Sequence, residues 1–257
     1  MPNYNRTRAA CYIGYVCQAV VVNLMPVLFL PLRTAYGLSY AQFGTLVLLN
    51  FTAQVGIDIL CSRAVEKHGM RHFVLCAQLC CCAGLLLLAA VPQLFGSHIF
   101  VGLLLATMLY AAGGGLLELC LSPIIDAIPA RTENPAREMA MLHAVYAWGQ
   151  VAVVLITTLL LAAKIPWQWI VLIWTPLPLC NFVVFWNAPI SVRVAAEDAT
   201  PIASLLKNKI FLCAVVAIIF GGASEQTMAQ YASSFLEEAA ELPKAVGDIV
   251  GLCGFAL

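Results

Sequence analysis

Charged residues are scarce in this 257-residue sequence: Asp, Glu, Lys and Arg make up 10% of it, while hydrophobic residues make up 62%. Soluble domains carry about 25% charged residues, so this chain has too few to cover a water-exposed surface. The formal net charge is zero, which gives no sign of the basic surface that nucleic-acid binding requires. These deficits argue against a soluble domain and against a nucleic-acid partner.

Motifs for enzymatic chemistry are also missing. The chain has 11 Cys, but Cys80, Cys81 and Cys82 are adjacent, and no Cys spacing resembles a zinc site or a disulfide framework. The three glycines at 113–115 are not followed by the Lys-Ser/Thr of a phosphate-binding loop. No nucleophile–base pair lies in a polar segment. The sequence therefore predicts no enzyme, no metal and no cofactor.

Apolar runs of about 20 residues, in contrast, recur along the chain, and this length crosses a hydrocarbon core of about 30 Å. They predict seven spans, at roughly 9–32, 41–61, 73–91, 99–128, 139–161, 167–186 and 210–235. An eighth run starts near Ala245 and stops at Leu257, too short to cross a bilayer. We therefore expect an all-α multi-spanning membrane protein and a truncated chain.

A polar segment over residues 187–208 follows the sixth span and mixes both signs of charge. It divides the chain into a six-helix transmembrane bundle over 1–186, a linker over 187–208, and the truncated start of a second bundle over 209–257.

The basic residues predict the orientation, because Lys and Arg near the ends of spans are retained in the cytoplasm. Arg33, Lys164 and Lys244 lie on one side. The opposite side, which includes the N-terminus, holds the other ten: Arg6, Arg8, Arg63, Lys67, Arg71, Arg131, Arg137, Arg193, Lys207 and Lys209. We expect a multi-pass protein of the inner or plasma membrane with a cytoplasmic N-terminus.

Polar residues recur at helical spacing within five of the spans, so each set shares one helix face. The sets are Asn50, Gln54 and Asp58; Tyr110, Gly114, Glu118, Ser122 and Asp126; His143, Tyr146 and Gln150; Gln226 and Gln230, with Glu225 beside them; and Tyr12, Tyr15 and Asn23 in the first span. Polar side chains inside a bilayer face a bundle interior or a water-filled cavity. We therefore expect spans one, two, four, five and seven to face something wet, and spans three and six to face lipid.

The segment "SRAVEKHGMRH" after the second span resembles the signature between helices two and three of the major facilitator superfamily. Glu66 stands at its Asp position, Lys67 at its Arg, Gly69 at its Gly, and Arg71 and His72 at basic positions, while Ser62 replaces the leading Gly. In addition, "GGGLLELCLSP" is similar to helix four of fucose:proton symporters, and "GGASEQTMAQYASSFLEE" to helix seven of bacterial sugar permeases. The resemblance covers the whole chain and implies the superfamily's N-terminal six-helix bundle, helix seven and a truncated helix eight.

The resemblance implies a secondary transporter that works by alternating access and couples a small polar solute, a sugar first of all, to protons. Because the missing C-terminal bundle is needed to enclose a solute from both sides, we expect that these residues alone do not transport. Glu118 matches the helix-four Glu that serves proton coupling or sugar binding in fucose:proton symporters. Because desolvation favours the neutral form of a carboxyl group, such a group can take a proton on one side and release it on the other. The alternative for Glu118 is a structural, protonated Glu bonded to a neighbouring helix. The Asp that the symporters carry in helix one has no counterpart here.

Two further sets of residues are expected to act with Glu118. The solute and proton site would include Asn23, His143, Tyr146, Gln150, Glu225, Gln226 and Gln230, with Glu225 as the second acid. For Glu225 and His143, helix packing is the alternative. Conformational control would involve Asp58, Glu66, Lys67, Gly69, Arg71 and Asp126, of which the basic residues have membrane anchoring as their alternative. Asp58 is expected to pair with Arg63 or Arg71 rather than to bind solute, and Asp126 to serve as a gate or in an ion pair.

Two other functions stay open at this stage. The same fold can expel amphipathic compounds, and seven spans are also the number found in membrane receptors. A receptor would ordinarily place its N-terminus outside the cell, which the distribution of basic residues opposes. We therefore expect symport of a small polar solute with protons, with efflux of amphipathic compounds as the first alternative.

Overall fold

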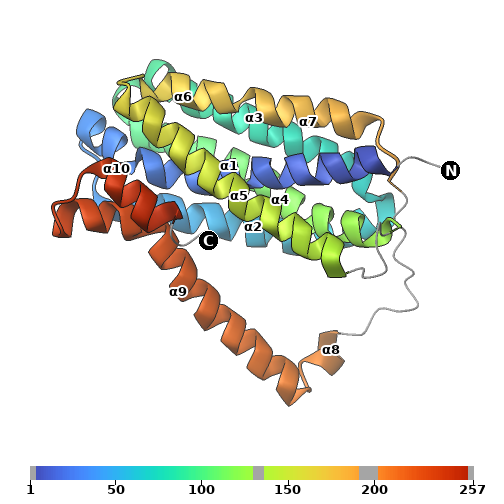
Figure 1. Cartoon of the computed structure of the whole chain (residues 1–257). Helices are drawn as coiled ribbons and strands as arrows, with labels where there is room; N and C mark the ends of the chain where they lie inside the picture. The colour runs from blue at the N-terminus through green and yellow to red at the C-terminus, as the bar shows by residue number, and fades with distance from the viewer. Residues whose placement is uncertain (1–3, 130–135, 191–201, 254–257) are drawn as a thin grey trace.

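The protein is described by a computed structural model that covers residues 4–129, 136–190 and 202–253, and all of its regular elements in these ranges are helical (Figure 1). The long helices are α1 (Asn5–Tyr36), α2 (Tyr40–His68), α3 (Met70–Phe95), α4 (Ile99–Ala127), α5 (Ala136–Ala162) and α9 (Lys209–Ala239). The shorter ones are η1 (Gly96–His98), α6 (Trp167–Trp174), α7 (Pro176–Trp186), α8 (Ile202–Leu205), α10 (Lys244–Gly247) and the π-helical turn η3 (Asp248–Cys253).

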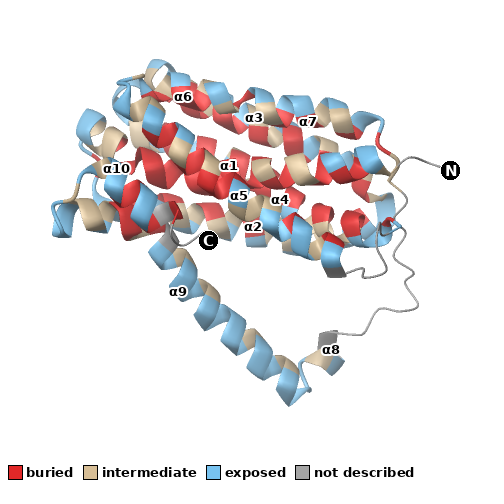
Figure 2. Ribbon diagram, viewed as in Figure 1, coloured by how far each residue is buried: buried red, intermediate tan, exposed pale blue. Residues whose placement is uncertain are grey.

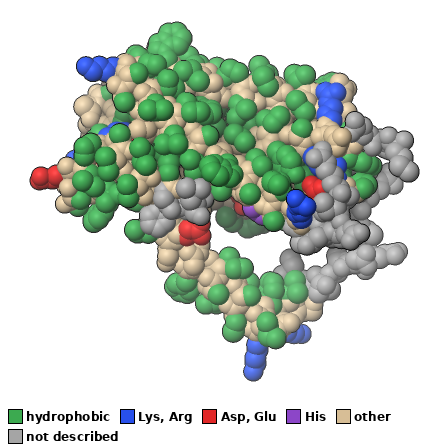
Figure 3. All heavy atoms as spheres, in the orientation of Figure 1, with side chains coloured by type: hydrophobic (Ala, Val, Ile, Leu, Met, Phe, Trp, Pro, Cys, Tyr) green, Lys and Arg blue, Asp and Glu red, His purple; other side chains and the backbone are tan. Residues whose placement is uncertain are grey.

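Six stretches of the described chain are long and apolar enough to cross a membrane. One of them, Met70–Ala127, contains both α3 and α4, and another, Trp167–Trp186, contains both α6 and α7. The face of the molecule in Figure 3 is covered mainly by hydrophobic side chains, and its Lys and Arg side chains lie toward the ends of the helices. The prediction of an all-α multi-spanning membrane protein is therefore confirmed.

Helix α1 lies at the centre of the bundle, and 83% of the residues in its most apolar 18-residue stretch are buried (Figure 2). It packs against α4, α5 and α7. We name the end of the bundle where α1 begins the N-terminal end, and the opposite end, where α1 ends and α2 begins, the Arg33 end. Because short connections join α1 to α2, α2 to α3 and α3 to α4, helices α2 and α4 run parallel, from the Arg33 end to the N-terminal end.

Small residues let α3 and α4 approach until their backbones touch. A Cβ added at Gly113 would lie 2.6 Å from Sγ of Cys81 and 2.7 Å from the carbonyl oxygen of Ala77. A Cβ added at Gly84 would lie 2.5 Å from the backbone nitrogen of Tyr110. Close packing at small residues is a common way for membrane helices to associate, and here it holds α3 tightly against α4.

The sixth span, predicted over 167–186, is present as one apolar stretch, Trp167–Trp186, made of two successive helices. Helix α6 ends at Trp174 and α7 starts at Pro176, with Thr175 between them. The backbone of Thr175 keeps helical dihedral angles, with φ −60° and ψ −37°, and what is interrupted is the hydrogen-bond ladder, because proline has no N–H to donate. The N–H of Thr175 bonds instead to the carbonyl of Leu172 at 3.3 Å.

Helix α9 follows the predicted linker and divides into two parts. Its first 20 residues, Lys209–Met228, are not buried in the described structure, and this part diverges from the bundle in Figure 1. Its last turns pack against α1 and η3. Within the predicted linker over 187–208, residues 191–201 lie outside the described residues, and α8 is the helix seen there.

Candidate functional site

A cavity of about 550 Å³ lies between α9 and the six-helix bundle. It is lined by residues of α1, α2, α4, α5 and α9: Tyr15, Gln18, Val22, Phe51, Gln54, Val55, Asp58, Glu118, His143, Tyr146, Ile218 and Gln226. These are the five spans whose polar residues recur at helical spacing. Figure 3 shows the hollow from the side, between the bundle and the diverging part of α9.

Four of the expected site residues lie together in this lining: Glu118, His143, Tyr146 and Gln226. The other four are not among the lining residues, since Asn23, Gln150 and Gln230 are buried and Glu225 is exposed on α9. Asn23 nevertheless lies next to the site, because its side chain forms a hydrogen bond with Tyr146. Nδ2 of Asn23 donates to the carbonyl of Ala19 at 3.0 Å.

Two buried glutamines connect α1, α2 and α4 at the floor of the cavity. Nε2 of Gln18 donates to Oε1 of Gln54 at 3.1 Å and to Oε2 of Glu118 at 3.5 Å. The side chains are almost fully enclosed, because Gln18 is 5% exposed and Gln54 is 4% exposed. One polar atom of each, Oε1 of Gln18 and Nε2 of Gln54, has no hydrogen-bond partner among the described residues. Both atoms are enclosed, and Oε1 of Gln18 lies against Gly114 of α4, where an added Cβ would be 3.1 Å from it.

The expected pairing of Asp58 with Arg63 or Arg71 is wrong. Asp58 lines the cavity and forms no ion pair within the described residues, and its buried Oδ1 has no hydrogen-bond partner there. The reason is helical register, since Asp58 follows Gln54 by four residues and shares its face of α2. Arg71 is directed elsewhere and donates to the carbonyl of Trp186 at 2.7 Å, at the end of α7.

A close crossing of α2 and α4 places the two acids near each other. A Cβ added at Gly115 of α4 would lie 2.9 Å from the carbonyl oxygen of Gln54 and 3.0 Å from its Cα. Because the two helices run parallel, Asp58 and Glu118 each lie about one turn, or roughly 5.4 Å, beyond this crossing in the same direction. Both carboxyl groups face the cavity from neighbouring helices.

Aromatic rings line the wall of the cavity between α1 and α5. The ring of Tyr15 meets those of His143 and Tyr146 edge to face, with centroid distances of 5.7 Å and 6.0 Å. The hydroxyl of Tyr15 also shares a hydrogen bond of 2.8 Å with Ser122 of α4. These contacts hold the ring of Tyr15 against both α4 and α5, so this wall is pre-organised.

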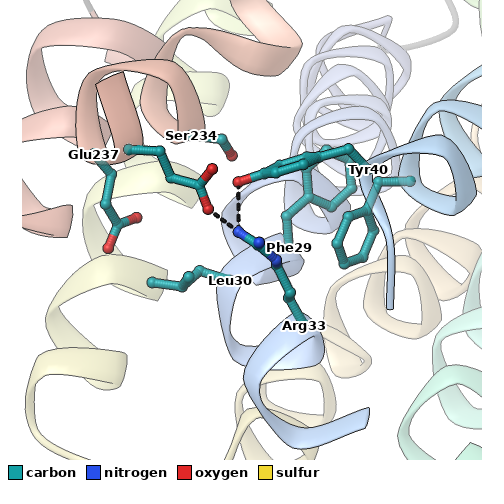
Figure 4. A pocket seen from close by; sticks show the side chains of 8 residues that line it. Phe29, Leu30, Arg33, Tyr40, Ser234 and Glu237 are labelled. Atoms are coloured by element: carbon teal, nitrogen blue, oxygen red, sulfur yellow. Dashed lines mark hydrogen bonds and ion pairs between the residues drawn. The ribbon is translucent and has the colours of Figure 1, made fainter. Parts of the chain in front are cut away.

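Contacts between α9 and the bundle close the Arg33 end. Figure 4 shows Arg33 of α1 between the hydroxyl of Tyr40 and the carboxylates of α9. Its guanidinium forms an ion pair with Glu238, donates to Tyr40 Oη at 2.9 Å, and lies 4.6 Å from the centre of the Tyr40 ring. Nearby, Asp248 is fully buried, accepts from Oγ1 of Thr158 at 2.5 Å, and pairs with Lys244 at 3.0 Å.

The residues expected to control conformation do not form a cluster. Glu66 and Lys67 are exposed in the last turns of α2, and Asp126 is exposed near the end of α4. None of these three forms an ion pair within the described ranges, so the ion pair expected of Asp126 is not there. Gly69 joins α2 to α3 with a φ of +84°, a conformation that favours glycine. Arg71 donates hydrogen bonds to the carbonyls at the end of α7.

The sequence analysis missed Gln18 as a lining residue and gave Asp58 a different role. Gln18 was not among the polar residues noted in the first span, although it follows Tyr15 by three residues and so lies on the same face. Asp58 was noted for its helical spacing but assigned to the loop, because basic residues follow it closely in the sequence. Its spacing from Gln54 was the better signal.

The chain belongs to the major facilitator superfamily, whose family model matches residues 11–257. Among solved structures, the chain is similar to the crystal structure of a D-xylose-proton symporter, with a TM-score of 0.75 and 13% sequence identity. The match covers 98% of this chain and 66% of that one, so the chain spans about two thirds of the symporter's length. At this identity the likeness shows the fold alone. No match is found among curated proteins.

Proposed function

We propose that this protein is the solute-binding part of a secondary active transporter that carries a small polar solute, with a sugar as the first candidate, together with protons. The observation that carries the proposal is the cavity, which gathers Glu118, His143, Tyr146 and Gln226 from separate helices. Alternating access about a site near the middle of the membrane is the general mechanism of such transporters. The fold shared with a D-xylose-proton symporter supports the choice of solute and coupling ion.

We further propose that the N-terminal end of the bundle faces the cytoplasm. The distribution of Lys and Arg supports this orientation. The Arg33 end, closed by the pair of Arg33 with Glu238, would then be the outer end. Since α9 diverges from the bundle toward the other end, the cavity would be open to the cytoplasm in this conformation.

Glu118 is the residue that links protonation to helix contacts in this proposal. An ionised carboxylate only accepts hydrogen bonds, and it accepts one from Nε2 of Gln18. A protonated carboxyl can also donate, to a solute hydroxyl or to a neighbouring amide oxygen. A change of protonation at Glu118 therefore changes the contacts that join α4 to α1, and through Gln54 to α2.

Efflux of amphipathic compounds is the second candidate, and one feature of the cavity favours it. Val22, Phe51, Val55 and Ile218 give the lining a large apolar part. An amphipathic substrate would bury its apolar part against these side chains and present its polar group to the acids.

Uptake of a labelled solute, by vesicles that hold the protein as its native gene encodes it, tests the proposal. With an imposed inward proton gradient, D-xylose and other sugars should accumulate, and a protonophore should abolish the accumulation. The variant Glu118→Gln keeps the size of the side chain but cannot exchange a proton. It should lose accumulation while retaining solute exchange at equal pH on both sides.

The control is Glu241→Gln, which removes an exposed carboxylate beyond the end of α9. It should accumulate solute as the unmodified protein does. Gradient-driven accumulation by Glu118→Gln at the unmodified rate would exclude Glu118 as the coupling residue. Gradient-driven expulsion of hydrophobic cations, with no sugar uptake, would favour efflux.

A further inference from the structure

The charge of the cavity lining is one-sided. Asp58 and Glu118 both line it, and the described lining residues include neither Lys nor Arg. The basic side chain among the described lining residues is that of His143. Two carboxyl groups that share a poorly hydrated site repel each other when both are ionised, and a bound cationic group relieves that repulsion. The charge therefore favours a ligand that carries a positive group.

The two glutamines provide an independent indication of a ligand. Oε1 of Gln18 and Nε2 of Gln54 are buried, lack partners among the described residues, and belong to side chains that line the cavity. Buried polar atoms without a partner destabilise a protein unless a ligand or water satisfies them. One atom accepts and the other donates, so a rotation of the two amides toward the cavity would suit a group that can do both, such as a hydroxyl.

The aromatic side chains add a third requirement. Tyr15, Phe51 and Tyr146 present rings to the same cavity. Such rings bind the apolar face of a small cyclic molecule, and they attract a cation that lies over the ring. An anionic solute, such as a sugar phosphate, would meet two like charges in this cavity and is disfavoured.

We propose that the solute of this cavity is a hydroxylated molecule with one ammonium group, of which an amino sugar is the simplest example. Asp58 and Glu118 face the charge, while the amides of Gln18 and Gln54 hydrogen-bond the hydroxyls. Asp58 is thereby a solute-binding residue rather than an anchor of the loop after α2. The proposal rests on the transport function proposed above and narrows its substrate class.

Binding of three related sugars to the purified protein in lipid nanodiscs, measured by calorimetry at pH 6.5, tests the proposal. Glucosamine carries an ammonium group, N-acetylglucosamine replaces it with a neutral amide, and glucose has a hydroxyl there. We expect glucosamine to bind at least about tenfold more tightly than either neutral sugar, because hydrogen bonds to charged partners are the stronger ones. This comparison uses the unmodified protein and needs no variant to fold.

Variants then assign the preference to residues. Asp58→Asn should reduce the preference for glucosamine to about threefold or less, because the amide keeps the shape and loses the charge. Asp58→Glu should restore part of the preference. The control Glu241→Gln, which removes a carboxylate outside the cavity, should keep all of it.

Several results would overturn the proposal. Equal or tighter binding of the neutral sugars, or tighter binding of tetraphenylphosphonium, a hydrophobic cation without hydroxyls, contradicts the substrate class. An unchanged preference in a folded Asp58→Asn variant removes Asp58 from the site. Proton-driven uptake of neutral sugars alone would refute the ammonium requirement and leave the proposed function intact, whereas the absence of any solute uptake by the native protein would refute both.

Discussion

Replacement of Gly115 by alanine tests the α2–α4 crossing that brings the two cavity acids together. The added Cβ would lie 2.9 Å from the carbonyl oxygen of Gln54, 3.0 Å from its Cα and 3.2 Å from Cβ of Ile57. Two of these atoms belong to the backbone of α2, so a side-chain rotation cannot relieve the overlap. Helix α2 must move away from α4, and Asp58 must move with it.

The size of the effect follows from two opposing contributions. Gly→Ala inside a helix stabilises it by about 1 kcal/mol, while overpacking of a close contact destabilises it by about 1–3 kcal/mol. Gly222→Ala in α9 isolates the second contribution, because a Cβ there has no atom within 4 Å and gains the helix propensity alone. Gly115→Ala should therefore be less stable than Gly222→Ala by about 2 kcal/mol, or about 4–8 °C in Tm.

Thermal unfolding of both variants in the same detergent, followed by tryptophan fluorescence, gives this difference. Calorimetric titration with glucosamine then shows whether the displaced α2 weakens solute binding, which we expect in Gly115→Ala and not in Gly222→Ala. Gly114→Ala should be milder, because its nearest neighbour is the end of a side chain, Oε1 of Gln18 at 3.1 Å. Equal Tm values for Gly115→Ala and Gly222→Ala would contradict the close crossing.

Three further substitutions test contacts at the two ends of the bundle. Arg33→Glu should raise the apparent solute affinity measured from the outside of vesicles, because the new carboxylate repels Glu238 at the closed end. Adding Glu238→Arg should reverse the change. An unchanged affinity in the single variant would argue against a closing contact. Arg71→Gln should lower Tm through the loss of charge-assisted bonds, worth about 1–3 kcal/mol, and Arg71→Lys should restore little, since two guanidinium nitrogens make these bonds. Arg8→Leu should lower the free energy of unfolding by about 3–5 kcal/mol, because it removes the cation paired with Glu138. The double variant Arg8→Leu with Glu138→Leu should recover much of this loss. A double variant no more stable than the single one would contradict this explanation.

The hydrophobic pattern predicted most of the fold, because a bilayer leaves few alternatives to helices about 20 residues long. The break between α6 and α7 was missed, although Pro176 and Pro178 stand at the point where an apolar run can be interrupted. Hydropathy averages over such a break, since two short apolar helices in line look like one span. A proline's missing N–H was the local signal.

The site was predicted in part, and the failures have a common cause. Glu118 and Gln226 are identifiable from the sequence because a polar side chain inside an apolar span usually faces a bundle interior or a cavity. The helix face that a residue shares does not tell how far its side chain lies from the cavity. Gln150 and Gln230 share faces with lining residues and are nevertheless buried in packing contacts. Asp58 was expected to pair with Arg63 or Arg71 because they are close to it in the sequence. The helical register instead places Asp58 on the face of α2 that lines the cavity.

Solute-driven proton movement tests the central claim most directly. A pH-sensitive dye outside vesicles that hold the native protein should report alkalinisation when solute is added without any imposed gradient, because each solute entering carries a proton with it. Glu118→Gln vesicles should give no such signal while still exchanging labelled solute. Solute uptake by the native protein with no accompanying proton movement would contradict the account.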